Sequence, residues 1–270
     1  MKKKMSIIIA GILFLAGLSL LLYPLVANQW NTYRQSRLIS EYETTVSTEN
    51  SEGAIDYEKE WEKANAYNAS LLPSILPDSF AIAAASDEPG DEYMSCLNIL
   101  NDGMMGYVEV PKINIKIPIF HTTSEEVLNK GAGHLEGSSL PVGGENTHAV
   151  ISAHRGLPSA SLFTDLDQLE KGDHFLISVL DQKLCYEVDQ IRTVEPEDTG
   201  DLAVEPGEDL VTLLTCTPYG VNTQRLLVRG HRVPYEEEVV EKEEKESPMS
   251  LYTNYLLWVV IGLAVTAVLI

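Results

Sequence analysis

The chain has 270 residues, of which 44% are hydrophobic and 22% charged, and its formal net charge is −21. This length is sufficient for one sizeable hydrophobic core with appended segments. The acidic excess repels nucleic acid, and no basic patch interrupts it, so the composition argues against a nucleic-acid partner. The acidic runs lack the ligand spacing of a calcium loop, and we therefore interpret them as solvated surface.

An uncharged apolar stretch near the N-terminus, 6–27, has the length of one bilayer crossing. Lys2, Lys3 and Lys4 precede it, which places the N-terminus in the cytoplasm by the positive-inside rule. A cleaved signal peptide is the alternative, but Leu25 stands where a cleavage site needs a small residue. We predict an uncleaved anchor within 1–28.

Two amphipathic helices are predicted next, with apolar stripes over 33–46 and 57–71, and the turn-forming residues 47–53 are expected to separate them. Asp56 is the expected N-cap of the second helix. The following stretch, 73–95, holds prolines, small residues and a Pro-Gly pair, which indicate a long connecting loop. We group 29–103 as one helical segment with a loop.

Beyond Gly103 the sequence changes to short β-branched runs separated by Gly, Pro, Asp and Asn, which is typical of strands. Brief helices are expected only near 124–131 and 159–169. Many strands with few helices predict an all-β domain over 104–235, as a closed barrel or a sandwich. The predicted strands are 106–110, 113–119, 147–154, 175–180, 184–194, 210–216 and 225–233.

An acidic linker, 236–250, leads to a second apolar stretch, 251–270. Tyr252, Tyr255 and Trp258 at its beginning are the aromatic residues expected at a membrane interface, so we predict a second membrane helix. A buried core helix is the alternative. Two spans with a cytoplasmic N-terminus place residues from about 28 to 250 outside the membrane.

Three cysteines leave at least one thiol unpaired. Cys96 and Cys185 lie in apolar runs and are interpreted as packed residues, with a Cys96–Cys185 disulfide as the alternative. Cys216 ends an apolar run directly before Thr217 and Pro218, and proline does not continue a central strand. Its thiol is therefore predicted at a strand exit, where a nucleophile can meet solvent.

Two further side chains stand at predicted strand ends. His154 ends the run 147–154 at a turn and is the candidate general base for the Cys216 thiol. Arg225 begins the strand after the Cys216 turn, where a guanidinium can stabilise a developing oxyanion. Each residue type alone is more commonly structural than catalytic. From spacing alone, the alternatives for the base are His121, His134 and His148.

Residues from about 105 to 234 resemble the sortases, specifically the class C, pilin-polymerising sortases of Gram-positive bacteria. The motifs that carry the resemblance are TLLTC (212–216), RLLVRG (225–230) and HAVISAHRGLPSASLFTDLDQLEKGD (148–173). The resemblance implies an eight-stranded β-barrel and a catalytic triad of Cys216, His154 and Arg225. We expect no cofactor and no metal at this site.

The resemblance also implies a transpeptidation. The Cys216 thiolate is expected to attack the Thr–Gly bond of an LPXTG-like sorting signal on a pilin subunit, and a lysine of another subunit then resolves the thioacyl-enzyme. One alternative is a sortase that attaches surface proteins to a peptidoglycan precursor, and another is a non-enzymatic β-barrel adhesin or scaffold. The expected location is the cell membrane, with the catalytic domain outside.

Class C sortases resemble one another in a lid, an Asp-Pro-aromatic tripeptide in the N-terminal loop that covers the site. The corresponding residues are Asp78, Ser79 and Phe80, with Asp78 paired to Arg225 or another cation and Phe80 over Cys216. Serine replaces the expected proline, which implies a less rigid turn. The tripeptide 87–89 is a second candidate without an aromatic residue, and an acidic loop that does not dock is the alternative.

Overall fold

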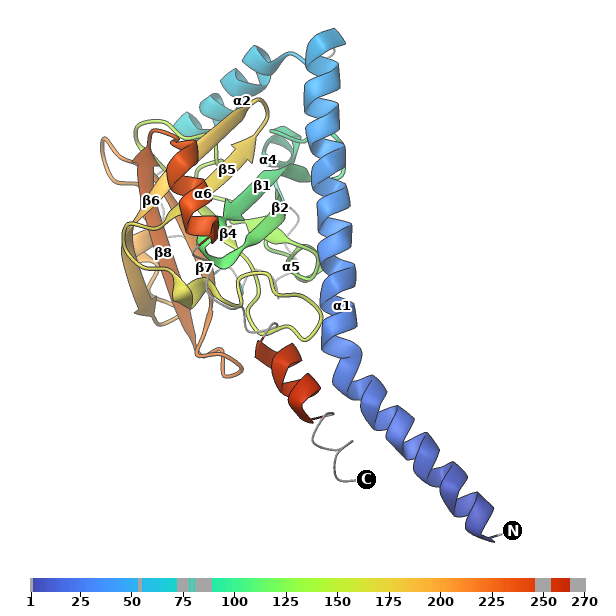
Figure 1. The fold of residues 1–270 in the computed structure, drawn as a ribbon. Coiled ribbons are helices and arrows are strands. Elements are labelled where there is room, and N and C mark those ends of the chain that lie inside the picture. Colours follow the sequence, from blue (N-terminus) through green and yellow to red (C-terminus); the bar gives the residue numbers. More distant parts are fainter. Residues whose placement is uncertain are drawn as a thin grey trace.

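Eight strands close into a β-barrel at the centre of the computed structural model, which describes residues 2–52, 55–71, 78, 80, 89–245 and 254–262 (Figure 1). The barrel order is β1-β2-β3-β4-β7-β8-β6-β5. The predicted all-β class and the eight-stranded barrel are thereby confirmed. The strands are β1 (Met104–Val110), β2 (Ile115–His121), β3 (Ala132–His134), β4 (Thr147–Ser152), β5 (His174–Val179), β6 (Gln182–Val194), β7 (Asp209–Thr217) and β8 (Gln224–Val233).

The helices are short except for the first one. They are α1 (Lys2–Glu52), α2 (Tyr57–Ser70), α4 (Asp91–Ser95), α5 (Glu125–Leu128) and α6 (Glu237–Lys245), with single 3-10 turns at Pro111–Ile113, Leu166–Gln168 and Gly200–Leu202. Asp56 caps α2 as predicted, since its side chain accepts a hydrogen bond from the Lys59 amide at 3.1 Å. The predicted loop 73–95 was too long at its end, because α4 occupies 91–95.

Two of the barrel's ladders are parallel, β2 with β3 and β4 with β7, and the others are antiparallel. The barrel interior is packed with apolar side chains, including Phe175 and Tyr186, whose rings stack with centroids 5.5 Å apart. Gly230 makes room for them, because a Cβ there would lie 2.7 Å from the Phe175 ring. Interior packing thus fixes the strands whose ends carry the candidate site.

Strand β3 escaped the sequence-based prediction. Its three residues, Ala132, Gly133 and His134, include no β-branched side chain, and so they lack the usual strand signal. Close approach explains the glycine: a Cβ at Gly133 would lie 2.3 Å from the Thr122 carbonyl oxygen. The predicted helix at 159–169 was also wrong over most of its length, because Leu162 adopts a left-handed conformation (φ 40°) and only 166–168 form a 3-10 turn.

The anchor and the first amphipathic segment form one continuous helix, α1, which runs along the side of the barrel (Figure 1). Its second half packs on the barrel. Tyr42 donates a hydrogen bond to the Met105 carbonyl at 2.9 Å and accepts one from the Leu180 amide at 2.8 Å. The break predicted from residue 47 onwards was therefore misplaced, because the helix continues to Glu52. At 1.5 Å per residue, α1 is about 76 Å long.

Within the described residues, one helix is long and apolar enough to cross a membrane, and the most apolar window of Lys4–Ser47 has no buried residue. The second predicted span, 251–270, is described only as helical turns at 254–262 and lies largely outside the described residues. In Figure 1 this short helix lies beneath the barrel, beside α1. The domain boundaries at 28, 103, 235 and 250 stay predictions.

Candidate active site

The site forms where β7 ends and β8 begins. Cys216 and Arg225 are direct partners in the antiparallel ladder between these strands, so their side chains lie next to each other at one rim of the barrel. Cys216 is 8% exposed. The chain turns back between them through 217–224, as the proline at 218 suggested. The structure therefore brings together a thiol and a guanidinium that are nine positions apart in the sequence.

His154 reaches the same rim from β4. The parallel β4–β7 ladder ends at Ser152, but the two chains continue side by side, since Thr215 donates its hydroxyl to the Ala153 carbonyl at 2.8 Å. His154 is the next residue, and Cys216 is the next residue on β7. In a parallel ladder these two positions are equivalent, and both side chains therefore stand at the same strand exit.

Arg155, the residue after His154, contacts the residue after Cys216. Its Nη1 donates to the Thr217 hydroxyl at 3.3 Å, and its Nη2 donates to the Asp167 carboxylate. Ala153 contacts Thr215, and Arg155 contacts Thr217. These two contacts lie on either side of His154 in one segment and of Cys216 in the other. No sequence signal indicated these contacts, because an arginine beside a turn is usually solvated, whereas Arg155 is buried.

Asp78 and Phe80 lie over Arg225 and His154. Asp78 accepts hydrogen bonds from Arg225 Nε at 2.6 Å and from Nη2 at 2.7 Å, a bidentate pair with both partners largely buried. The Phe80 ring lies 5.5 Å from the His154 ring and 5.1 Å from the Arg225 guanidinium carbon. Phe80 also packs against an apolar cluster that includes Leu214. Its ring therefore faces the histidine and the arginine of the rim.

Burial sets the resting charges of this site. It raises the pKa of the Cys216 thiol, an effect that Arg225 opposes and Asp78 reinforces. It lowers the pKa of His154, which Glu125 opposes. Both directions favour the uncharged forms, a thiol and a neutral imidazole. The hydrogen bonds to Asp78 raise the pKa of Arg225, so the guanidinium stays charged.

Comparison with known proteins identifies the family. A family model for the sortase domain matches residues 108–233. The chain is 50% identical to a sortase C of Streptococcus pneumoniae, covering 74% of this chain and 97% of that one, with a TM-score of 0.67. The chain belongs to the sortase family.

Other solved structures agree. Sortase C1 of Streptococcus agalactiae is 48% identical, with 74% of this chain and all of that chain covered and a TM-score of 0.64. Sortase C-1 of Actinomyces oris is 45% identical over 66% and 98% of the two chains, with a TM-score of 0.62. The resemblance of this sortase to class C is thereby confirmed.

Among curated relatives, sortase D of Bacillus subtilis is 32% identical over 131 residues, which are 47% of this chain and 63% of that protein. Sortase A of Streptococcus agalactiae is 27% identical, with 64% and 66% of the two chains covered. The chain thus spans slightly less than two thirds of the length of these two curated relatives.

The other histidines of this sortase that the sequence left open are fixed in the barrel wall. His148 contacts the Ala203 carbonyl through Nδ1 and the Thr212 hydroxyl through Nε2, both at 2.8 Å. His121 and His134 are likewise buried and have both ring nitrogens in hydrogen bonds. His148 lies six residues before His154 on its strand, about 20 Å away at 3.3 Å per residue. This arrangement favours His154 as the base.

The other two cysteines are free and buried, so the alternative of a Cys96–Cys185 disulfide was wrong. Cys185 lies within β6, and burial raises the pKa of its thiol to about 11. Within the ranges that the structure describes, no group of three His, Cys, Asp or Glu side chains could hold a metal ion.

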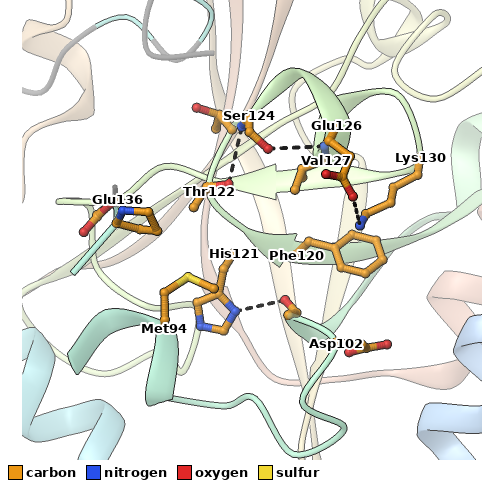
Figure 2. A pocket seen from close by; sticks show the side chains of 13 residues that line it. Met94, Asp102, Phe120, His121, Thr122, Ser124, Glu126, Val127, Lys130 and Glu136 are labelled. Atoms are coloured by element: carbon orange, nitrogen blue, oxygen red, sulfur yellow. Dashed lines mark hydrogen bonds and ion pairs between the residues drawn. The ribbon is translucent and has the colours of Figure 1, made fainter. Parts of the chain in front are cut away.

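A separate pocket of about 320 Å³ lies beside β2 and α5, and Figure 2 shows its lining. Its acidic side chains are already engaged. Glu126 forms an ion pair with Lys130 at 3.5 Å, and Glu136 accepts a hydrogen bond from the Gly90 amide at 2.9 Å. None of the rim residues lines it, so this pocket is distinct from the candidate active site.

Proposed function

We propose that this sortase is a pilin-polymerising cysteine transpeptidase in which Cys216 is the nucleophile, His154 the general acid and base, and Arg225 the oxyanion-binding group. The observation that carries the proposal is the convergence of these three side chains on one rim, from three strand ends. It occurs in a chain that is 45–50% identical to sortase C structures, one of which is described in terms of pilin substrate specificity.

The first half-reaction acylates the enzyme. His154 accepts the Cys216 proton, and the thiolate attacks the threonine carbonyl carbon of an LPXTG-like signal on a pilin subunit. Arg225 donates hydrogen bonds to the oxyanion of the tetrahedral intermediate. As the carbon–nitrogen bond breaks, the imidazolium of His154 returns its proton to the leaving glycine amine. A thioester between the pilin and Cys216 results.

The second half-reaction joins two subunits. A neutral lysine amine of another pilin attacks the thioester carbon, and Arg225 again holds the oxyanion. His154 accepts the proton that the attacking amine loses and returns it to the Cys216 sulfur as the carbon–sulfur bond breaks, so that an isopeptide bond and a neutral thiol remain. Uncharged resting forms suit both halves, because the base must be free to accept a proton and the thiol must be released as a neutral group.

Asp78 and Phe80 act as a lid in this proposal. Asp78 occupies Nε and Nη2 of Arg225, which are the donors that an oxyanion needs. Phe80 lies against the imidazole that must reach Cys216. Substrate binding therefore requires this segment to move away.

The proposed location is the cell membrane, with α1 as the anchor and the barrel on the outer side. The exposed apolar half of α1 and the cell-surface location of sortases in Gram-positive bacteria support it. The membrane is then one partner, and pilin subunits that bear the sorting signal are the other.

The test uses the full chain in lipid nanodiscs with a candidate pilin that carries the signal. We expect a covalent ladder on a denaturing gel and a thioacyl adduct on Cys216 by mass spectrometry. Transfer to peptidoglycan stem peptides without a ladder would instead support the cell-wall-anchoring alternative. An inert Cys216, with signal cleavage unchanged in Cys216→Ala, would leave the adhesin or scaffold alternative.

A further inference from the structure

The two loops that leave the catalytic rim contain no charged residue. One, 156–164, follows His154, and the other, 217–224, follows Cys216. The second loop is exposed at 218–223, whereas four residues of the first loop, 160 and 162–164, are buried. A loop that faces water has no need to exclude charge, whereas a loop that rests on lipid does.

The loop after Cys216 also exposes large apolar side chains. Outside α1 and segment 254–262, the exposed large hydrophobic residues among the described ones are Val204, Tyr219, Val221 and Tyr235. Two of these four lie in 217–224, with Tyr219 48% and Val221 63% exposed. Exposed large apolar side chains of the described barrel are thus concentrated on the turn that follows the catalytic thiol.

Hydrogen bonds hold the first of these loops, 156–164, level with the end of the apolar part of α1. The Asn28 side chain accepts a hydrogen bond from the Ser161 amide at 2.8 Å, and the Asn31 side chain donates one to the Ser159 carbonyl at 2.7 Å. The apolar stretch of α1 ends at residue 27, directly before these contacts. The loop 156–164 is therefore fixed at the height where the helix leaves the bilayer.

A mostly apolar pocket of about 190 Å³ joins the three parts at this level. Its walls include Pro24 of α1, Leu157 and Pro158 of the first loop, Tyr219 of the second loop, and Tyr255. The Tyr255 hydroxyl donates to a carbonyl within the apolar stretch of α1 at 2.7 Å. The catalytic rim is thus continuous with the proposed membrane-spanning surface.

Aromatic side chains mark the same height on the helix itself. Tyr23, Trp30 and Tyr33 are all exposed on α1, and tyrosine and tryptophan are the residues that gather at the boundary between headgroups and acyl chains. Tyr219 has the same chemistry, and it lines a pocket together with Pro24, the residue after Tyr23.

From these observations we infer that the turn 217–224, together with Leu157 and Pro158, rests on the outer surface of the lipid bilayer. The inference rests on the proposed membrane anchoring. Tyr219 and Val221 enter the headgroup region, and Cys216 then works at the membrane surface. The bond that it cleaves must therefore be presented close to the surface of the bilayer.

Depth-dependent quenching tests this inference on the full chain. Single cysteines, Val26→Cys, Val221→Cys and Val204→Cys, are placed in a Cys216→Ala background and labelled with nitrobenzoxadiazole, since Cys96 and Cys185 are buried. The protein is reconstituted in phosphatidylcholine–phosphatidylglycerol vesicles with lipids that carry a nitroxide near the headgroup. Val26 reports the anchor, and Val204, which is 47% exposed in the acidic β6–β7 connection, is the matched control.

We expect strong quenching at positions 26 and 221 and at least threefold weaker quenching at position 204. Quenching at 26 with none at 221 beyond the level of 204 overturns the membrane contact and leaves the anchor intact. No quenching at 26 overturns the anchor and the contact together. Neither outcome affects the proposed chemistry, because ladder formation and the thioacyl adduct are measured separately.

Discussion

The barrel wall and the barrel rim hold the same two chemically active residue types in opposite settings. In the wall, Cys185 lies within a strand, and His148 has both ring nitrogens bonded to the protein itself. At the rim, Cys216 and His154 lie at strand exits, beside an arginine and beneath a segment from a distant part of the chain.

Burial alone therefore does not separate structural from reactive groups in this fold. Burial moves the pKa of Cys185 and of Cys216 in the same direction. Cations lie near both thiols, Arg232 and Lys183 near Cys185 and Arg225 near Cys216. What distinguishes the rim is the position of the thiol and the imidazole at strand exits, beneath Asp78 and Phe80. The following variants test that distinction between wall and rim.

The largest effect is expected for the thiol itself. Cys216→Ala should reduce cleavage of a signal peptide by about 10⁴-fold or more, because the nucleophile is lost. Cys185→Ala, the wall counterpart, should retain the specific activity of the folded protein. Peptide cleavage followed by mass spectrometry measures both, and equal losses in the two variants would erase the distinction.

The arginines of β8 provide the second test. Arg225→Ala should lower kcat/KM by about 10²–10³-fold, the cost of removing one oxyanion donor. Arg229→Ala is the matched control, because Arg229 lies on the same strand as Arg225 and also forms a bidentate ion pair, in its case with Asp189 of β6. We expect activity close to normal in that control. A comparable loss would mean that β8 requires its ion pairs only for folding.

The third test concerns the pH dependence of the thiol. Asp78 raises the pKa of Cys216 and Arg225 lowers it, so Asp78→Asn should lower this pKa. Alkylation by iodoacetamide requires the thiolate; its rate should rise several-fold at neutral pH, and its pH profile should move to lower pH. Asp189→Asn serves as the control. A profile that stays in place in Asp78→Asn would show that Asp78 does not act on the thiol.

Phe80→Ala should have a smaller effect in the same direction, about two- to threefold faster alkylation of Cys216, because the ring lies on His154 and Arg225 without adding charge. Its pH profile should stay in place, in contrast to that of Asp78→Asn. An unchanged rate would indicate that the aromatic ring does not limit access to the site.

The smallest effect on chemistry is expected in the wall. His148→Ala leaves the Ala203 carbonyl and the Thr212 hydroxyl without a buried partner, which costs about 1–3 kcal/mol of unfolding free energy. Urea unfolding measures this loss, while the activity per folded molecule should remain that of the parent chain. A selective loss of activity would reopen the choice of base.

Much of this fold could be predicted from local pattern. Alternating β-branched runs indicated seven of the eight strands, and Pro218 indicated where β7 stops. Strand β3 carries no such pattern. Its glycine, Gly133, is required by close contact with the backbone at Thr122. The continuity of α1 through 47–52 also lacks a local signal, since its packing on the barrel and the contact of the Tyr57 hydroxyl with the Val46 carbonyl are tertiary.

The site was only partly accessible to the same approach. The predicted strand ends placed Cys216, His154 and Arg225 at one rim of the barrel. Spacing did not choose among the candidate histidines, and only the family resemblance selected His154. The partners of Arg155 are separated from it along the chain, and its sequence neighbours resemble an ordinary turn. A polar contact between two strand exits cannot be read from either strand alone.

The bidentate pair between Asp78 and Arg225 has a consequence for substrate selection. A site that is open in one molecule of every hundred raises the apparent dissociation constant of any ligand about a hundredfold. Short peptides make few contacts, and a hundredfold rise in their apparent dissociation constant leaves no measurable binding. A folded pilin that touches further surface retains binding. In the proposed lid, the ion pair therefore filters substrates by their total contact with the enzyme, without recognising any feature of them.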